Sequence, residues 1–308
     1  MKKQTDWKVF LAYAAIYIIW GSTYLALMIG VQSMPPFVLS AVRFTFAGVL
    51  LYAYCLYKGE IQTDLLSWKK NALCGILMLS GGTVSVAWAE QYIPSSLAAI
   101  IVTSLPFWFI LLDKRQWKYY VSDKKIIAGL IIGFIGVAAL LWFGNTSHPF
   151  NGNTQMKTWG IIVILIGGVA WTSGSLYSKY SPAQNSVLMN ASQQLLAAGV
   201  FTFAISYFSG EWSDYDFSNA TAASWSALIY LVTVGSIVAY LSYLWLLKVR
   251  PAAQVSTYVY INPVVAVLLG AAIAGEKISW IQVAALFVIL CGVLLVNITK
   301  YKKAEQKV

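Results

Sequence analysis

The sequence predicts an all-α integral membrane protein in which ten transmembrane helices form two inverted five-helix repeats. Three observations predict this fold. The chain is 59% hydrophobic and only 10% charged, whereas a soluble domain is about half apolar and one-quarter charged. Its basic residues gather between apolar runs, mostly on one side of the predicted membrane. A set of tryptophan, glycine and proline positions also recurs at nearly constant spacing in the two halves.

The apolar runs between turn signals define the predicted helices. A bilayer crossing takes about 20 apolar residues, so a chain of 308 residues has room for about ten helices with short loops. Pro36, Pro94, Pro182 and Pro251 fall at predicted boundaries, because proline starts a helix more readily than it continues one. The first run is too long for a signal-peptide core, so we expect it to be retained as a helix. The predicted helices are residues 7–30, 37–57, 70–92, 96–112, 125–143, 158–178, 186–208, 223–247, 252–274 and 279–298.

The lysines and arginines predict the orientation of these helices. With ten spans, eighteen of them fall on the side of both termini, and only Lys157 and Lys277 fall on the other. Arg43 is left within a helix. Cytoplasmic loops carry an excess of Lys and Arg, so both termini are expected in the cytoplasm. The net charge of +10 thus reports orientation, and no nucleic-acid partner is expected.

Matched positions in the two halves predict the internal repeat. An offset of 151 carries Trp20 onto Trp171, and an offset of 157 carries Pro106 onto Pro263. Because each half has five spans, an odd number, the second half must be inserted upside down relative to the first. Secondary transporters with this arrangement bind solute between the halves. Further matched pairs are Arg43 with Gln194, Gly48 with Gly199, Trp88 with Trp245, Pro94 with Pro251 and Gly136 with Gly292.

Short motifs in both halves point to a family. They are Trp20-Gly21-Ser22-Thr23-Tyr24, Met34-Pro35-Pro36 with Arg43, Ala89-Glu90, Pro94-Ser95-Ser96-Leu97-Ala98-Ala99 with Pro106, Asn262-Pro263 and Gly275-Glu276. With these motifs the chain resembles, over essentially its whole length, the drug/metabolite transporter superfamily and within it the EamA-type exporters. One departure is Leu112-Asp113-Lys114-Arg115, where the family often has a Gly-Glu pair like Gly275-Glu276.

The resemblance implies a bacterial inner-membrane exporter of amino acids, related metabolites or drugs that works by alternating access. It implies a first five-helix EamA-like repeat at residues 1–145 and a second at residues 146–308. It also implies a cavity lined mainly by the first, third, fourth, sixth, eighth and ninth helices. The direction of transport rests on the resemblance alone.

Arg43 is the most informative single residue, because a cation inside a membrane helix is costly unless it is paired or hydrated. Glu90 is predicted near the outer end of the third helix, within reach of a snorkelling arginine, so we expect the two to pair. Such a pair serves either helix packing or function, in which Glu90 exchanges protons or meets the amino group of a solute. Protons are therefore the candidate coupling ion.

Aromatic and hydroxyl residues are candidates for solute contact. Trp20 and Trp171 are repeat-related, and each precedes small hydroxyl residues. Aromatic faces with a few hydroxyls suit an amphipathic organic solute, although the same residue types also pack helices and line membrane interfaces. The candidates of this kind are Trp20, Tyr24, Trp88, Trp171 and Ser175.

Two matched prolines mark the predicted fourth and ninth helices. Each proline lacks a backbone donor and frees a carbonyl one turn earlier, so Pro106 and Pro263 are candidate kinks beside the pathway. Tyr258 and Asn262 are four residues apart and share a helix face, and Ser104 shortly precedes Pro106. We expect these three as polar contacts, with interhelical hydrogen bonding as the equal alternative.

Other function classes have less support. The sequence has no HExxH or GxSxG motif and no histidine in a predicted membrane helix, so neither a convergent catalytic set nor a metal site or cofactor is expected. A passive channel would not need matched inverted halves. An integral-membrane enzyme and a passive channel for small solutes stay the alternatives to a secondary transporter. The expected partners are a small-molecule solute and the lipid bilayer, with the oligomeric state open.

Overall fold

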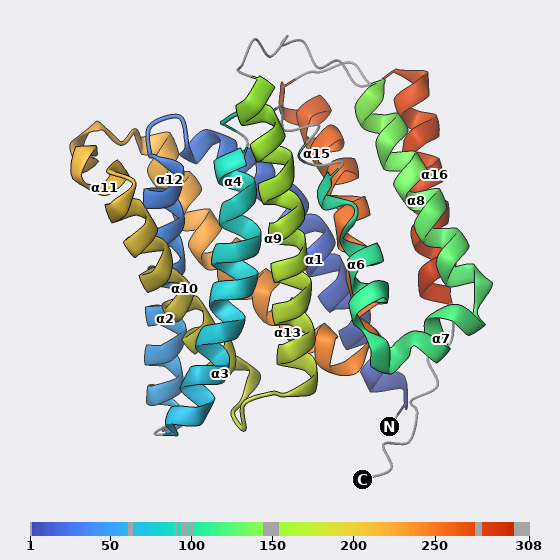
Figure 1. The fold of residues 1–308 in the computed structure, drawn as a ribbon, viewed down its shortest axis with the longest axis horizontal. Coiled ribbons are helices and arrows are strands. Elements are labelled where there is room, and N and C mark those ends of the chain that lie inside the picture. The colour runs from blue at the N-terminus through green and yellow to red at the C-terminus, as the bar shows by residue number, and fades with distance from the viewer. Residues whose placement is uncertain are drawn as a thin grey trace.

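The computed structural model describes residues 2–60, 64–89, 91–93, 98, 101–143, 154–274 and 279–298. Within these ranges every regular element is a helix, and the helices pack side by side in one bundle (Figure 1). Helix α1 (Lys2–Gly30) begins at the bottom of Figure 1. We call this end of the bundle basal and the end at which α1 finishes distal.

The long helical stretches that follow run in alternating directions between the two ends, and some of them contain several consecutive elements (Figure 1). In the first half they are α2 (Pro36–Tyr57), α3 (Leu65–Gly75), η1 (Ile76–Val84), α4 (Ser85–Ala89), α6 (Leu105–Leu112), η2 (Lys114–Gln116), α7 (Trp117–Ser122) and α8 (Lys124–Trp142). In the second half they are α9 (Thr154–Tyr180), α10 (Val187–Phe208), α11 (Glu211–Asp214), η3 (Phe217–Asn219), α12 (Ala222–Tyr230), η4 (Leu231–Val238), α13 (Ala239–Val249), α14 (Ala252–Val255), α15 (Tyr258–Ala274) and α16 (Trp280–Ile298).

Eight helical stretches among the described residues are long and apolar enough to cross a membrane. They are Trp7–Gly30, Pro36–Tyr57, Leu65–Ala89, Gln155–Tyr180, Val187–Phe208, Ala222–Val249, Ala252–Leu269 and Trp280–Ile298. Helix α8 occupies the place of the predicted span 125–143, and the predicted span 96–112 is only partly described. The all-helical prediction is confirmed for the described residues, whereas the number ten stays a prediction.

The third and eighth predicted spans contain π-helical segments that the sequence pattern did not predict. Segment η1 lies between α3 and α4, and η4 lies between α12 and α13. The offset of 157 carries residues 76–81 of η1 onto residues 233–238 of η4. π-Helical segments are rare and are often found at functional sites, and both of these segments face the cavity described below.

The ninth predicted span is interrupted near its basal end. Helix α14 ends at Val255, and α15 begins after a turn at Ser256 and Thr257. The hydroxyls of these two residues donate to the carbonyls of Ala253 (2.9 Å) and Gln254 (2.7 Å). Backbone groups freed by the break thus keep partners, as non-helical backbone at membrane depth requires.

Glycines bring two pairs of helices into backbone contact. A Cβ added to Gly48 on α2 would lie 2.7 Å from the backbone nitrogen of Leu196 on α10, and one added to Gly199 would lie 2.7 Å from that of Thr45. The offset of 151 relates Gly48 to Gly199 and Thr45 to Leu196, so the same contact is made twice in opposite directions.

Helices α8 and α16 meet in the same way. A Cβ on Gly292 would lie 2.5 Å from the nitrogen of Gly133, and one on Gly136 would lie 2.9 Å from that of Ile289. The offset of 156 carries Gly136 onto Gly292 and Gly133 onto Ile289, so these two contacts also join matched positions of the two halves. Small residues permit such close approach between membrane helices.

A glycine substitution tests how strongly the bundle depends on this packing. A Cβ on Gly75 would overlap the carbonyl oxygen of Gln194, whereas one on Gly168 meets nothing closer than 3.6 Å. Gly75→Ala should therefore lower the free energy of unfolding by about 1–3 kcal/mol through overpacking. Gly168→Ala should leave it unchanged or raise it, because alanine is the better helix former. Thermal unfolding in detergent measures both, and equal stability of the two variants would contradict the packing described.

Candidate solute-binding site

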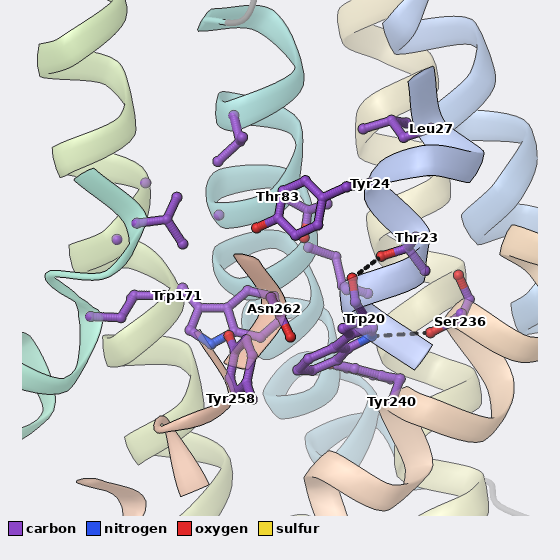
Figure 2. Close-up of a pocket in the computed structure, with 18 of the residues that line it drawn as sticks. Trp20, Thr23, Tyr24, Leu27, Thr83, Trp171, Ser236, Tyr240, Tyr258 and Asn262 are labelled. Atoms are coloured by element: carbon purple, nitrogen blue, oxygen red, sulfur yellow. Dashed lines mark hydrogen bonds between the residues drawn. The ribbon is translucent and has the colours of Figure 1, made fainter. Parts of the chain in front are cut away.

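The bundle contains a partly open cavity of about 150 Å³ between helices of both halves. Figure 2 shows the side chains that surround it. For comparison, an apolar cavity of about this volume in an engineered protein accepts one benzene molecule, so the space suits a small organic group. The described lining residues are Trp20, Thr23, Tyr24, Leu27, Arg43, Phe44, Leu79, Gly82, Thr83, Val86, Ile101, Val102, Leu105, Ile164, Gly167, Gly168, Trp171, Leu195, Gly235, Ser236, Tyr240, Tyr258 and Asn262.

Four rings form an aromatic cluster at the basal end of this cavity: Trp20, Trp171, Tyr243 and Tyr258. The centroid of Trp20 lies 5.8 Å from that of Trp171, 5.1 Å from that of Tyr243 and 4.6 Å from that of Tyr258. Tilted and edge-on pairs at these separations are the favoured arrangements of aromatic rings. The two repeat-related tryptophans predicted from the sequence are therefore in contact, with the predicted Tyr258 beside them.

Ser175 supports the aromatic cluster from below and does not line the cavity. Its hydroxyl lies 2.8 Å from the Tyr243 hydroxyl, which also accepts a hydrogen bond from the Trp171 indole at 3.0 Å. Ser175 donates to the Trp171 carbonyl at 2.7 Å. These bonds fix the indole of Trp171 on α9 relative to α13.

One wall of the cavity is polar and is formed by α1, α2, η4, α13 and α15. The Arg43 side chain is only 8% exposed, and its Nε donates to the Ser236 hydroxyl at 2.7 Å. The Trp20 indole donates to the Gly235 carbonyl at 3.2 Å. Gly235 also leaves room for the arginine, because a Cβ there would lie 3.2 Å from an Arg43 terminal nitrogen. Segment η4 thus supplies both a hydroxyl and a carbonyl to this wall.

Asn262 contributes an unpaired acceptor to the same wall. Its side chain is 3% exposed, and its Oδ1 atom has no hydrogen-bond partner in the described part of the structure. Buried polar atoms without partners are uncommon in folded proteins. Because this atom belongs to a cavity-lining residue, a solute that carries a donor can satisfy it.

The opposite wall is apolar and is formed around α4, α6 and α9. Val86, Ile101, Val102, Leu105 and Ile164 line it together with two glycines of α9. The offset of 157 carries Ile101 onto Tyr258 and Leu105 onto Asn262. At these two pairs of equivalent positions, the first half lines the cavity with apolar residues and the second half with polar ones.

Several predicted site residues lie outside this lining. Trp88 packs against Tyr92 with ring centroids 4.9 Å apart, and the Ser104 hydroxyl accepts from the Trp108 indole at 3.2 Å. Pro106 lies in the first turn of α6, where its missing donor costs nothing, and Pro263 lies inside α15. Glu90, the predicted partner of Arg43, lies outside the described residues.

Sequence reasoning missed Thr83, Ser236, Tyr240 and Tyr243. A signal for two of them was present, because the repeat offset of 157 carries Thr83 onto Tyr240, and both line the cavity. Nothing in the sequence pairs Ser236 with Arg43, since that contact depends on how α2 meets η4.

Comparison with known proteins identifies the family. The model of a family described as the EamA-like transporter family matches residues 7–142 and 158–298. The chain belongs to the EamA-like transporter family. The expected resemblance and the transporter class are thereby confirmed.

Relatives of this EamA-like protein cover nearly its whole length. It is 37% identical to the uncharacterized inner membrane transporter YedA of Escherichia coli K12, over 95% of this chain and 92% of YedA. It is 24% identical to the uncharacterized transporter YetK of Bacillus subtilis, over 100% of this chain and 93% of YetK. One crystal structure with 18% identity covers 94% of this chain and 96% of its own, with a TM-score of 0.76, and shows the fold alone.

A buried polar network links the cavity of this EamA-like protein to the basal half of the bundle. The Tyr240 hydroxyl donates to the Gln194 side chain at 2.6 Å, and Gln194 donates to Asn71 at 3.0 Å. Asn71 in turn donates to Asn190 at 2.9 Å and to Gln193 at 2.7 Å. Gln194 is the repeat equivalent of Arg43. The matched positions on α2 and α10 therefore both contact the span that contains η4.

Two near-isosteric substitutions test whether a buried polar residue is there for solute contact or for protein stability. Gln194→Met strands the buried polar groups of Tyr240 and Asn71 and should lower the free energy of unfolding by about 1–3 kcal/mol. Asn262→Leu removes an acceptor, Oδ1, that has no partner among the described residues, so it should lower the free energy of unfolding by less. Thermal unfolding in detergent compares them. A larger loss for Asn262→Leu than for Gln194→Met would contradict the assignment of Asn262 to the solute.

Proposed function

We propose that this protein is a secondary transporter that exports a small organic solute by alternating access between two inverted five-helix halves, residues 1–145 and 146–308. The observation that carries the proposal is the cavity, which lies between the two family-matched segments and is lined by equivalent positions of both. Amino acids, related metabolites and drugs are the proposed solute classes. Ten spans are the proposed number.

Pairs of contacts between matched positions of the two halves support the inverted arrangement. Gly48 with Leu196 and Gly199 with Thr45 relate the two halves, as do Trp20 and Trp171 in the aromatic cluster. Such reciprocal contacts are what a pseudo-two-fold axis between the halves produces.

We place the protein in the bacterial inner membrane with both termini cytoplasmic. The name of the relative YedA supports the membrane, and the eighteen-to-two division of basic residues supports the orientation. The basal end is then the cytoplasmic end.

We propose that contacts between the halves close the basal side of the cavity. The Asp113 carboxylate at the end of α6 is 1% exposed and accepts hydrogen bonds from Tyr180 on α9 (2.7 Å) and Tyr120 on α7 (2.8 Å). The hydroxyls of Tyr17 on α1 and Thr257 lie 2.8 Å apart. We call Tyr17, Asp113, Tyr180 and Thr257 the basal seal. Alternating access requires this seal to open, and Asp113 occupies the place where the sequence departs from the family pattern.

The two walls support an amphipathic solute. The hydrogen-bonding groups of Arg43, Ser236 and Asn262 face its polar end, and the aliphatic side chains around α4 and α6 face its hydrocarbon part. Pockets of this kind take their affinity from apolar contact and their selectivity from a few polar groups. Protons are the proposed coupling ion, with Glu90 as the proposed carrier.

Matched tryptophan substitutions test the function. Trp171→Phe changes the cavity, whereas Trp88→Phe changes a residue outside its lining. Mass spectrometry of the medium of overproducing cells should find specific amino acids or related metabolites enriched with the wild type and with Trp88→Phe. The enrichment should fall at least about tenfold with Trp171→Phe at equal membrane abundance, as loss of one well-placed contact predicts. Equal enrichment for all three proteins would overturn the assignment of the site. Flux that saturates with solute concentration, together with counterflow of unlabelled solute, separates a carrier from a channel.

Removal of one hydroxyl tests the basal seal. Tyr180→Phe deletes a donor to Asp113, so the basal-open state should become more populated. In a background with the three cysteines replaced by serine, Ala253→Cys places a thiol at a fully buried basal position. Its labelling by a membrane-impermeant maleimide in inside-out vesicles should become several-fold faster with Tyr180→Phe. Tyr57→Phe, at an exposed site, is the control, and equal rates in both variants would exclude this role for the seal.

A further inference from the structure

A second concavity lies on the outside of the bundle, in the seam between α1 and α13. Its volume is about 530 Å³. It shares no lining residue with the central cavity, and Leu11 (49% exposed) and Val238 (46% exposed) show that it opens outward. Its described lining residues are Lys8, Leu11, Ala12, Ala15, Val238, Leu241, Ser242 and Trp245. We call it the α1–α13 groove.

Helix periodicity places these residues on two facing stripes. Residues 8, 11, 12 and 15 follow three- and four-residue steps along α1, and residues 238, 241, 242 and 245 do the same from the last residue of η4 along α13. Ala12 and Ala15 have side chains too small to fill the space between the helices. Each stripe runs over eight residues, and its seven steps cover about 10 Å at about 1.5 Å per residue. That length is most of one leaflet, whose hydrocarbon is about 15 Å deep.

The groove offers apolar surface along its length and a cation at its basal end. Six of its eight lining residues are apolar. The Ser242 hydroxyl donates to the Val238 carbonyl of its own helix at 2.8 Å, so it needs no outside partner. Lys8 begins the α1 stripe at the basal end, and the exposed Lys248 follows Trp245 by three residues on α13. Lysine near a helix end extends its charge to the headgroup region.

We propose that the α1–α13 groove binds one anionic phospholipid of the basal leaflet, with an acyl chain between the two stripes and the phosphate on Lys8. A lipid-facing groove at this depth cannot stay empty without losing dispersion contacts along its walls, and water there would lack polar partners. A hydrocarbon chain meets both conditions. Near a membrane surface each lysine favours an anionic lipid by about fivefold. Only the naming of this leaflet as cytoplasmic rests on the proposed orientation.

Helices α1 and α13 contribute lining residues to both the groove and the central cavity. Trp20 on α1 and Tyr243 on α13 are in ring contact across the same seam, 5.1 Å apart. A bound lipid would therefore brace the junction at which a helix of the first half meets a helix of the second.

Native mass spectrometry of the purified full-length protein tests the proposal. The probes are phosphatidylglycerol and phosphatidylcholine with the same acyl chains, added at equal concentration to delipidated protein. The wild type should retain one phosphatidylglycerol in about fivefold preference to phosphatidylcholine. Ala15→Leu fills the groove and should reduce lipid retention at least about fivefold, whereas Ala53→Leu, at an exposed alanine of α2, should match the wild type.

A charge substitution keeps the test decisive if Ala15→Leu fails to fold. Lys8→Gln should abolish the preference for phosphatidylglycerol without reducing phosphatidylcholine retention, and Lys69→Gln, an exposed lysine on α3, should leave the preference intact. Equal retention of the two lipids by the wild type would overturn the proposal. A preference for phosphatidylglycerol that survives Lys8→Gln would also overturn it. A change from dimer to monomer in Ala15→Leu would overturn it too, because the groove would then bind a second copy of the chain.

Discussion

Backbone contact between helices at glycine is the constraint on which the rest of this structure depends. In a bilayer the lipid tails are as apolar as the side chains, so helices associate through close van der Waals packing rather than through the hydrophobic effect. Gly48 and Gly199 bring α2 against α10, and Gly133 and Gly292 bring α8 against α16. These two tight pairs lie on either side of α1, α9 and α15 (Figure 1). The cavity is lined by residues of those three helices.

The cavity places a cation at membrane depth on a polar wall. Arg43 has the Ser236 hydroxyl as a partner, and Gly235 leaves space for its terminal nitrogen atoms. Gly235 and Ser236 both belong to the π-helical segment η4, and the π-helical segment η1 lies at the matching place in the other half. The apolar wall comes from the first-half positions that match Tyr258 and Asn262. At these matched positions the first half supplies apolar side chains and the second half polar ones, whereas Arg43 adds a polar group from the first half.

The sequence predicted what depends on composition and on one-dimensional spacing. Hydropathy located the helices because a bilayer tolerates only backbone that satisfies its own hydrogen bonds. The repeat offsets paired Gly48 with Gly199 and Trp20 with Trp171, and these residues lie at the junction of the halves. The sequence did not predict contacts that arise from how helices meet, such as the bond from Tyr180 to Asp113. Segments η1 and η4 were missed because an α-helix and a π-helix share the same hydrophobic pattern over so few residues.

In the proposed mechanism the two halves rock about a fixed cavity so that its ends open in turn. Distances between spin labels test it most directly. One doubly labelled protein carries labels at Lys118 and Lys248, at the basal end, and another carries them at Gln32 and Lys157, at the distal end; all four are exposed. In nanodiscs, addition of a transported solute should shift the two distance distributions in opposite directions. Distances that stay fixed at both ends, or lengthen together, would contradict alternating access.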